Sequence, residues 1–410
     1  MSEWKKVKLG ELYEVHNGLS KGRQFFGSGY PFLTFSTVFN NYFLPKELDS
    51  LVQSSEKERE ACSIRKGDVF ITRTSETMDE LGMSSVALRD YPNATYNGFT
   101  KRLRPITDNV IPEYIGYYLR SPKFRGKFMA FSTMTTRASL ANADLLGMEV
   151  EIPSKEEQHR IATILSRYDS LIENYQKQIK LLEEAAQRLY KEWFVDLHFP
   201  GHENTKIVDG VPEGWEKKKL CELFSFVRGK SYTSKELSDE GTIMVNLKNI
   251  QSFGGYKSDV EKHFIGTFKE EQTLMKGDLI MGVTDMTQER RLVGSVALIP
   301  DFKETATFSM DLIKLISFKL PNIYLYCAMR YGDVSRQIAP LANGVNVLHL
   351  KPEAISNIEM VVASDSIIEK FVSYTSKTIE SILSLQSQLR LLTEARDRLL
   401  PKLMSGEIEI

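Results

Sequence analysis

Two polar segments of this 410-residue chain carry residue types suited to contact with nucleic acid. Between residues 100 and 137, eight lysines and arginines accompany only two carboxylates, and aromatic residues lie among them. The segment runs into FSTMTTRASL, where hydroxyl groups surround Arg137. Lysine and arginine neutralise phosphates, and arginine and hydroxyl side chains can also reach base edges. The alternative is an aromatic core beneath a solvated, charged helix, because a basic run is a weakly specific feature.

The second candidate is a stretch that occurs twice. GDVFITRTSETMDELGMSSVAL begins at Gly67 and GDLIMGVTDMTQERRLVGSVAL at Gly277, an offset of 210 residues (277 − 67), and the two share both ends. The polar residues between those ends differ. Bases are read by hydrogen-bonding side chains, so a constant frame with different loops suits the reading of two short sequences. Free drift of a surface loop is the alternative.

These segments, with neighbouring basic and hydroxyl residues, define the candidate DNA-binding set. ANGVNVLHL is included because the same offset aligns it with MTTRASL. In the first half the set comprises Lys21, Arg23, Arg73, Thr74, Ser75, Lys101, Arg102, Lys123, Arg125, Thr133, Thr135, Thr136 and Arg137. In the second half it comprises Lys230, Ser231, Tyr232, Thr284, Asp285, Gln288, Arg290, Arg291, Asn343, Asn346 and His349.

Motifs for catalysis, cofactors and metals are missing from the sequence. FSFVRGKS ends like a phosphate-binding loop but has Phe224 where the first glycine is required. No glycine-rich dinucleotide loop and no Asn-Pro-Pro-aromatic stretch of an amino-methyltransferase occurs, and His198 and His202 lie in a polar, proline-containing segment. We therefore expect no catalytic residue, metal or cofactor in this chain.

The offset extends over the whole chain. LLEEAAQRLYKEW at Leu181 is repeated as LLTEARDRLLPKL at Leu391, and WKKVKLGEL at Trp4 as WEKKKLCEL at Trp215, the last pair with one residue of slippage. The sequence is thus a tandem duplication. Its period exceeds those of solenoid repeats, so each copy is expected to be a domain with an appendage.

The appendage is expected to be a long helix. From Glu156 to about Val195 there is no proline or glycine, and apolar residues recur at alternating spacings of four and three. The second copy keeps this register with polar lapses at Thr375, Thr378 and Arg396. The heptad pattern predicts that the two helices pair, and each ~40-residue helix would reach ~60 Å. The pairing residues are expected to be Ile161, Leu165, Ile172, Ile179, Leu182, Leu189, Phe371, Ile382, Leu385, Leu389, Leu392 and Leu399.

Short β-type runs ahead of each helix predict an α+β fold with two mixed domains. We expect strands at Val69 to Thr72, Met148 to Ile152, Leu279 to Val283 and Ile358 to Val362, and helices at Pro112 to Arg120 and Pro321 to Tyr331. The expected order is a first domain (1–153), a spacer helix (154–196), a linker (197–213), a second domain (214–363) and a second spacer helix (364–410).

The overall composition is that of a globular protein. Hydrophobic residues make up 42% and charged residues 26%, while a net charge of −1 requires any nucleic-acid contact to rest on local patches. Three cysteines without CxxC spacing argue against disulfides or structural zinc. No signal-peptide core or bilayer-length apolar run occurs, so a cytoplasmic location is expected.

Four phrases resemble the specificity subunits of type I restriction-modification systems. They are IPSKEEQHRIATIL at Ile152, RLYKEWFVDLHFPG at Arg188, DGVPEGWEKKKL at Asp209 and RDRLLPKLMSGEI at Arg396. Their order covers essentially the whole chain. The second copy departs from the pattern where VVASDSIIEKF replaces the proline and Glu-Gln of the first.

The resemblance implies a non-catalytic subunit whose two target recognition domains each read one half of a bipartite, asymmetric DNA site. It also implies that the antiparallel helices set the spacing and bind two methyltransferase subunits, which carry S-adenosylmethionine, with restriction translocase subunits as possible further partners. Two alternatives stay open at this point. One is a coiled-coil adaptor that binds proteins through its domains, and the other is a fused methyltransferase or nuclease, which would need a cofactor or metal motif.

Overall fold

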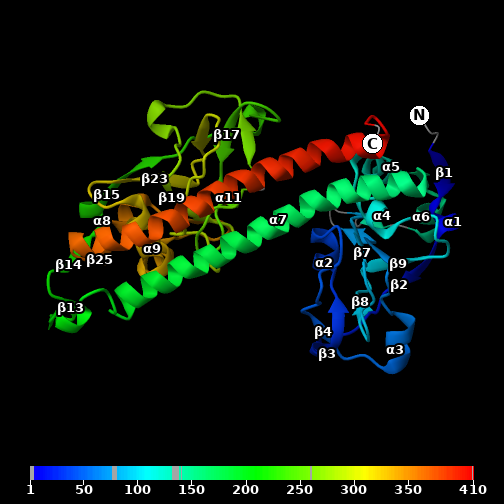
Figure 1. Ribbon diagram of the computed structural model, residues 1–410, viewed down its shortest axis with the longest axis horizontal. Helices are drawn as coiled ribbons and strands as arrows, with labels where there is room; N and C mark the ends of the chain where they lie inside the picture. Colours follow the sequence, from blue (N-terminus) through cyan, green and yellow to red (C-terminus); the bar gives the residue numbers. More distant parts are fainter. Residues whose placement is uncertain (1–3, 76–80, 132–137, 140, 259–260, 409) are drawn as a thin grey trace. The chain divides into compact units, whose positions relative to one another are not determined.

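The computed structural model describes residues 4–75, 81–131, 138–139, 141–258, 261–408 and 410. It divides into two compact units, here called unit 1 (Met1–Ser170 with Glu394–Ile410) and unit 2 (Leu171–Thr393). Each unit holds one α+β domain and part of two long helices, α7 (Lys155–Tyr190) and α11 (Asp365–Ser405) (Figure 1). The expected α+β fold is confirmed.

The centre of unit 1 is an antiparallel four-stranded sheet in the order β2 (Tyr13–Asn17), β9 (Thr100–Pro105), β5 (Val69–Thr72), β7 (Ser84–Val86). Every residue of β5 is buried, as expected for a strand covered on both faces. A second sheet has the order β4 (Leu51–Val52), β3 (Phe26–Leu33), β8 (Thr95–Tyr96), with β3 and β8 parallel.

Two further strand pairs complete unit 1. One joins β1 (Lys5–Lys8) to β11 (Glu149–Ile152), just before α7, and the other joins β6 (Thr74–Ser75) to β10 (Ala138–Ser139). The helices of the domain are α1 (Leu9–Leu12), η1 (Arg23–Phe25), α2 (Phe35–Asn40), α3 (Glu56–Ala61), α4 (Pro112–Tyr118), α5 (Pro122–Phe131) and α6 (Asn142–Gly147).

Unit 2 repeats this plan. Its central sheet has the order β15 (Phe224–Arg228), β23 (Leu312–Ser317), β19 (Leu279–Gly282), β21 (Val296–Leu298). Its second sheet has the order β16 (Leu237–Ser238), β18 (Lys262–Phe264), β17 (Thr242–Val245), β22 (Ala306–Phe308). The strand pairs are β14 (Glu216–Lys219) with β25 (Glu359–Val362), and β20 (Thr284–Asp285) with β24 (Leu348–His349).

The remaining elements of unit 2 are short, apart from its part of the two long helices. The expected linker contains η3 (His202–Asn204) and a small hairpin of β12 (Ile207–Val208) and β13 (Val211–Pro212). The helices are η2 (Lys191–Val195), α8 (Leu220–Leu223), η4 (Ser234–Glu236), η5 (Leu247–Asn249), η6 (Glu270–Gln272), α9 (Asn322–Tyr331), α10 (Val334–Ile338), η7 (Ala339–Leu341) and η8 (Pro352–Ile355).

The duplication reappears in strand register, with one correction. Thr284 pairs with His349 as Thr74 pairs with Ser139, so both strands of this pair are displaced by 210 residues. The neighbouring hairpins differ, because the Thr72 amide donates to Met83 whereas the Gly282 amide donates to Ser295, a displacement of 210 on one strand and 212 on the other. The loop of the second copy is therefore two residues longer, and the shared Ser-Val-Ala-Leu is not structurally equivalent at the 210 offset.

The two long helices run antiparallel within each unit. In unit 1, Ile161 and Leu165 near the start of α7 share a core with Leu400 and Leu403 near the end of α11. In unit 2, a late α7 residue meets an early α11 residue, because the Tyr190 ring lies 5.9 Å from that of Phe371. All twelve expected pairing residues are buried in, or packed against, these cores, namely Ile161, Leu165, Ile172, Ile179, Leu182, Leu189, Phe371, Ile382, Leu385, Leu389, Leu392 and Leu399.

The start of α7 shows why the helix begins where the sequence predicts. Pro153 precedes Ser154, whose hydroxyl accepts a hydrogen bond from the Glu157 amide at 3.2 Å and satisfies one of the free donors of the first turn. The Gln158 side chain, fully buried, accepts from the Ile111 amide and donates to the Pro153 carbonyl, so it ties the helix to the domain before it.

Among the described residues, no helix has the length and apolarity needed to span a membrane.

Candidate nucleic-acid interface

Loops from four places in the sequence meet at one end of the central sheet of unit 2. The Lys230 amide donates to Phe308, and the Met310 amide donates back to Lys230, so the loop after β15 lies beside the loop before β23. The Val283 amide donates to Asp311, which brings in the loop after β19. The pairing of β20 with β24 adds residues 343–349. The sequence-predicted residues of the second half are therefore gathered at one edge.

Side chains hold the two longest of these loops together. The Thr284 hydroxyl and His349 Nδ1 are 2.9 Å apart, and the Gln288 amide nitrogen donates to the Val345 carbonyl at 2.8 Å. Asp285 is 1% exposed and accepts hydrogen bonds from the Thr287 amide and hydroxyl and from the Leu292 amide. Burial thus makes Thr284 and Asp285 organisers of the loop, not groups offered to a ligand.

The groups left at the surface of this loop cluster are polar, with apolar tips. Ser231, Gln288, Arg291, Asn343, Asn346 and His349 are exposed, while Lys230, Tyr232 and Arg290 are half-buried. Tyr232 packs edge-on against Phe264 at 6.3 Å, and burial raises the pKa of its hydroxyl. Met286 and Val345 are 76% and 88% exposed. Sequence reasoning missed these two, although Gly344 beside Val345 signals a turn that presents its neighbour.

Unit 1 repeats the frame. Leu19 bridges Asn97 as Lys230 bridges Ser309, and the Arg73 amide donates to the Phe99 carbonyl at 3.0 Å. The Phe99 side chain is 56% exposed beside this frame. The backbone of Thr74 and Ser75 lies in β6, whereas Thr133, Thr135, Thr136 and Arg137 lie outside the described residues.

Three predicted cations of unit 1 lie at or near this end. Arg23 is exposed in η1, and Arg73 Nη1 lies 3.5 Å from the Asn17 side-chain oxygen. Lys21 forms an ion pair with Glu58 at 2.8 Å and lies over the Phe25 ring. The Lys21 contact, with a hydrogen bond from the Ser55 amide, lowers the pKa of Glu58 to about 2. A DNA phosphate would compete with Glu58 for Lys21.

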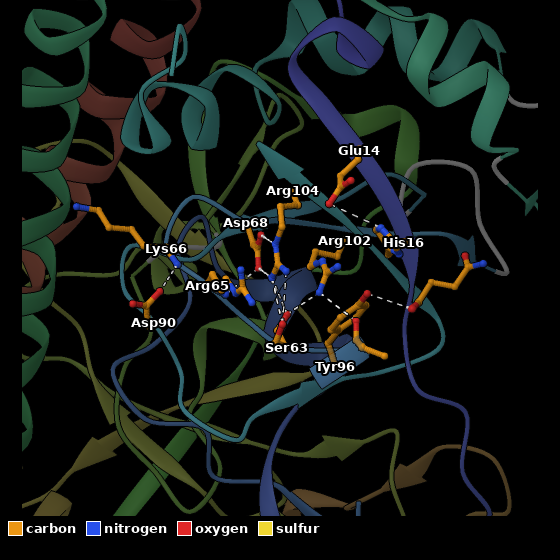
Figure 2. Close-up of polar contacts among 12 residues, drawn as sticks. Glu14, His16, Ser63, Arg65, Lys66, Asp68, Asp90, Tyr96, Arg102 and Arg104 are labelled. Carbon is orange, nitrogen blue, oxygen red and sulfur yellow. Dashed lines mark hydrogen bonds and ion pairs between the residues drawn. The ribbon is translucent and has the colours of Figure 1, made fainter. Parts of the chain in front are cut away.

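Figure 2 corrects the interpretation of the basic stretch that begins at residue 100. Arg102 is 2% exposed, and its Nη1 donates to the Ser63 and Ala61 carbonyls. Arg104 pairs with Asp68 at 2.7 Å and donates to the Ser63 carbonyl. Residues two apart in a strand point to the same face, and both of these side chains reach the Ser63 carbonyl, so the segment around Ser63 covers that face of β9. Arg102 is therefore part of the domain interior.

Lys101 and the rest of the stretch are also largely engaged within the domain. Lys101 is 4% exposed and donates to the Asn142 side chain, and burial, assisted by Arg73, lowers its pKa. Lys123 pairs with Glu151 at 2.5 Å, and the Arg125 guanidinium donates to the Leu81 carbonyl. The surplus of six positive charges in this stretch is thus not an open basic surface, and Lys101, Arg102, Lys123 and Arg125 are not part of the candidate interface.

The two histidines of the linker lie close together. His198 and His202 have ring centres 5.3 Å apart, and His202 Nδ1 lies 2.9 Å from the Phe199 carbonyl oxygen. Within the described ranges no group of three or more histidine, cysteine or acidic residues is arranged to hold a metal ion.

Comparison with known proteins agrees with this geometry. Residues 1–184 match the family described as type I restriction modification DNA specificity domain. The chain is 27% identical to the type I restriction enzyme MjaIX specificity subunit of Methanocaldococcus jannaschii, over 100% of this chain and 94% of that one. It is 23% identical to the HindI specificity subunit of Haemophilus influenzae, over the full length of both.

A solved structure shares the fold. The type I restriction-modification S subunit from M. genitalium superimposes with a TM-score of 0.58 at 16% identity, over 98% of this chain and 96% of that one. The duplicated α+β domains, the long helices and the full-length similarity to named relatives agree with one another. Along its whole length the chain is similar to specificity subunits of type I restriction-modification systems, and residues 1–184 match their DNA specificity domain.

Proposed function

We propose that this chain reads a bipartite, asymmetric DNA site, one half with each domain, and itself performs no catalytic step. The supporting observation is the repeated loop frame, in which β6 with β10 and β20 with β24 keep the same pairing while the loops that follow differ. A constant frame places the reading side chains at equivalent positions in two domains. Different loops then read different bases, because donors and acceptors on the side chains decide which base edge is matched.

The long helices suit a spacing function. At 1.5 Å per residue, the 36 residues of α7 span ~54 Å and the 41 residues of α11 span ~62 Å. Both exceed the ~34 Å repeat of the DNA duplex. We propose that these helices set the number of unread base pairs between the half-sites.

The partners follow from this role. The relatives are named as subunits of type I restriction enzymes, and we propose that two methyltransferase subunits bind this chain, one associated with each half of the duplication. These subunits would carry S-adenosylmethionine. A restriction translocase subunit joins the complex where the system includes one.

Sequencing of modified bases tests the proposal. Cells that express the chain with its methyltransferase subunit should carry methyladenine in one bipartite motif, and cells lacking only the chain should not. A stable complex that yields no chain-dependent motif would contradict the proposal and favour an adaptor that binds proteins.

A second experiment tests the spacing role. Seven residues, one heptad, are inserted at matched positions of α7 and α11, so that the apolar seam stays in register. The expected result is a changed number of unread base pairs in the methylated motif, or loss of methylation with an intact fold by circular dichroism. An unchanged motif would remove the spacing role and leave the reading role standing.

A further inference from the structure

We propose that an arginine-lined pocket in unit 2 binds a phosphate group, and that in the working complex this phosphate belongs to the DNA backbone. The inference rests on the proposed function only for the source of the phosphate.

The pocket has a volume of about 600 Å³. One wall is residues 289–295, the end of the loop that follows β20, and the opposite wall comes from the end of α9 and from α10. Ser252 to Gly254 and Gln187 close the remaining sides. Protein sites for small ligands have volumes of about 300 to 1,000 Å³, so a phosphate with its attached sugar fits.

The residues that line the pocket include more arginines than carboxylates. Four arginines line the pocket, Arg290, Arg291, Arg330 and Arg336, with Glu289 as the one lining carboxylate. Arg291 pairs with Glu289 at 2.7 Å, and Arg330 pairs with Glu183 at 2.8 Å. Among the residues that the structure describes, no carboxylate pairs with Arg290 or Arg336. Two guanidinium groups therefore face this pocket without a counter-charge.

Arg290 shows a second sign of an absent acceptor. Its Nε is buried and makes no hydrogen bond, as is also true of the Nε of Arg102, but Arg290 lines a pocket that an acceptor could enter. Its backbone also has a φ of 54°, in the left-handed region that arginine rarely adopts. Backbone strain of this kind concentrates at ligand sites, where the surrounding structure holds it in place.

The pocket walls are fixed to each other. The Ser335 hydroxyl lies 2.7 Å from both the Gly294 and the Met329 carbonyl oxygens, so one side chain ties the loop wall to the helix wall. Gly294 has a φ of 76°, and a Cβ there would lie 2.9 Å from Ile338. A site held in this way loses little conformational freedom when an anion binds.

Phosphate is the anion that this arrangement fits best. Guanidinium groups donate parallel hydrogen bonds to two phosphate oxygens, and neighbouring arginines can share the remaining charge. The pocket begins at Glu289, directly after Gln288, which holds the two reading loops together. A backbone phosphate bound here would set the register of those loops on the duplex, since phosphate contacts position a protein while base contacts specify the sequence.

The sequence confines the site to the second half. The loop of the first copy, SETMDEL, contains Glu76, Asp79 and Glu80 and no cation, whereas TQERRL contributes Arg290 and Arg291. Gly126 stands at the position 210 residues before Arg336. The two halves should therefore differ in salt dependence as well as in the bases read.

The first experiment measures duplex binding by the chain in complex with its methyltransferase subunit. The variants are Arg336→Ala, which removes an exposed side chain, and Arg290→Gly, which removes the charge and relieves the backbone strain. Each should weaken binding to specific and nonspecific duplexes alike by about tenfold, and should reduce the slope of log Kd against log salt by about 1. Lys217→Ala, an equal charge change on exposed β14, is the control. Wild-type affinity and slope in both arginine variants would overturn the proposal for DNA.

Two further measurements identify the source of the phosphate. Neutral methylphosphonates replace the phosphates of the duplex one at a time. At one position the replacement should weaken duplex binding by the wild type but not by Arg336→Ala. Inorganic phosphate is titrated separately, with the thermal midpoint as readout. If phosphate stabilises the wild type more than both variants while DNA affinity is equal in all three, the pocket binds a free phosphate compound. If neither measurement separates wild type from variants, the pocket inference is overturned.

Failure of the proposed function has a different signature. In that case the wild-type complex shows no preference for any duplex sequence, and equal nonspecific affinity in the wild type and both arginine variants would overturn DNA as the source. The titration with inorganic phosphate then still decides whether the pocket is an anion site.

Discussion

Arg120 in unit 1 and Arg330 in unit 2 occupy equivalent positions, 210 residues apart, yet their guanidinium groups have different kinds of hydrogen-bond partner. The Arg120 guanidinium donates to the carbonyls of Ser84, Val38 and Phe39, and burial lowers its pKa to about 10. Arg330 donates to both carboxylate oxygens of Glu183 on α7. Burial disfavours its charge, but Tyr326 and Glu183 raise its pKa overall.

Because Arg120 is satisfied inside its own domain, unit 1 attaches its domain to the long helices through other residues. The Tyr117 hydroxyl donates to Asp169 on α7, and Arg396 on α11 donates to the other oxygen of Asp169 at 2.9 Å. Arg396 is one of the polar lapses in the heptad seam, and the structure gives it a partner there. The two copies of the domain are thus attached to the long helices by different ion pairs. In unit 2 the arginine of the pair, Arg330, belongs to the domain, whereas in unit 1 both partners, Arg396 and Asp169, belong to the helices.

The largest effect is expected from removing Glu183. Glu183→Ala leaves Arg330, 10% exposed, without its carboxylate, and should lower the free energy of unfolding by about 3 to 5 kcal/mol. Chemical denaturation of the full chain measures this. The double variant Glu183→Leu with Arg330→Met should recover most of the loss, because no charge is left buried. A loss below about 1 kcal/mol in the single variant would refute the idea that unit 2 depends on this pair.

A smaller effect is expected from the corresponding pair of unit 1. In Asp169→Ala, Arg396 keeps its 2.8 Å contact with Asp397, so the loss of unfolding free energy should be about 1 to 3 kcal/mol. Tyr117→Phe, which removes only one hydrogen bond to Asp169, serves as the matched control and should cost about 1 kcal/mol. If Asp169→Ala were as damaging as Glu183→Ala, the two attachments would be equivalent and the contrast drawn above would not hold.

Gln288 tests the reading loops of unit 2 separately from the helices. Gln288→Ala removes the bond to the Val345 carbonyl, and should weaken specific DNA binding by about 1 kcal/mol with unchanged stability. The loss of sequence preference should be confined to one half-site, measured by competition with duplexes altered in either half. A loss of sequence preference in both half-sites would show that the two domains do not read their half-sites independently.

The smallest effect concerns Glu58, the exposed partner of Lys21 in unit 1. Its pKa is lowered to about 2, so its stabilising contribution is fully present above the ordinary value near 4.5 and is lost as pH falls toward 2. The difference in melting temperature between wild type and Glu58→Gln should therefore shrink as the pH falls from 5 to 3. Most of the contribution of Glu58 is lost between its ordinary pKa of about 4.5 and its lowered pKa of about 2. In unit 2 the pKa of Glu236 is lowered mainly by hydrogen bonds from the Thr233 amide and hydroxyl, and Lys230 adds a smaller electrostatic contribution. A constant difference across this range would exclude the Lys21 pair as its cause.

The interpretation of the basic stretch shows where sequence reasoning reached its limit. Lys101, Arg102 and Arg104 read as a surface patch because carboxylates are scarce among their neighbours in the sequence. Their partners, such as Ser63, Asp68 and Asn142, come from 36 to 41 residues away and are brought close only by the sheet. The Ser-Val-Ala-Leu match did not mark equivalent positions, for a related reason. The loop of the second copy is two residues longer, so the same four residues lie two positions earlier in its returning strand.

The sequence by itself determined the duplication, the long heptad helices, the α+β domains and the loops that could read bases. Each of these depends on local periodicity or on residues that recur at a fixed offset, and both are visible along one dimension. Only the tertiary structure decided which cations are buried, that Arg396 is paired across the helix seam, and that Arg290 and Arg336 share a pocket. Charge neutralisation acts between atoms a few ångströms apart, and residues at that distance can be hundreds of positions apart in the chain.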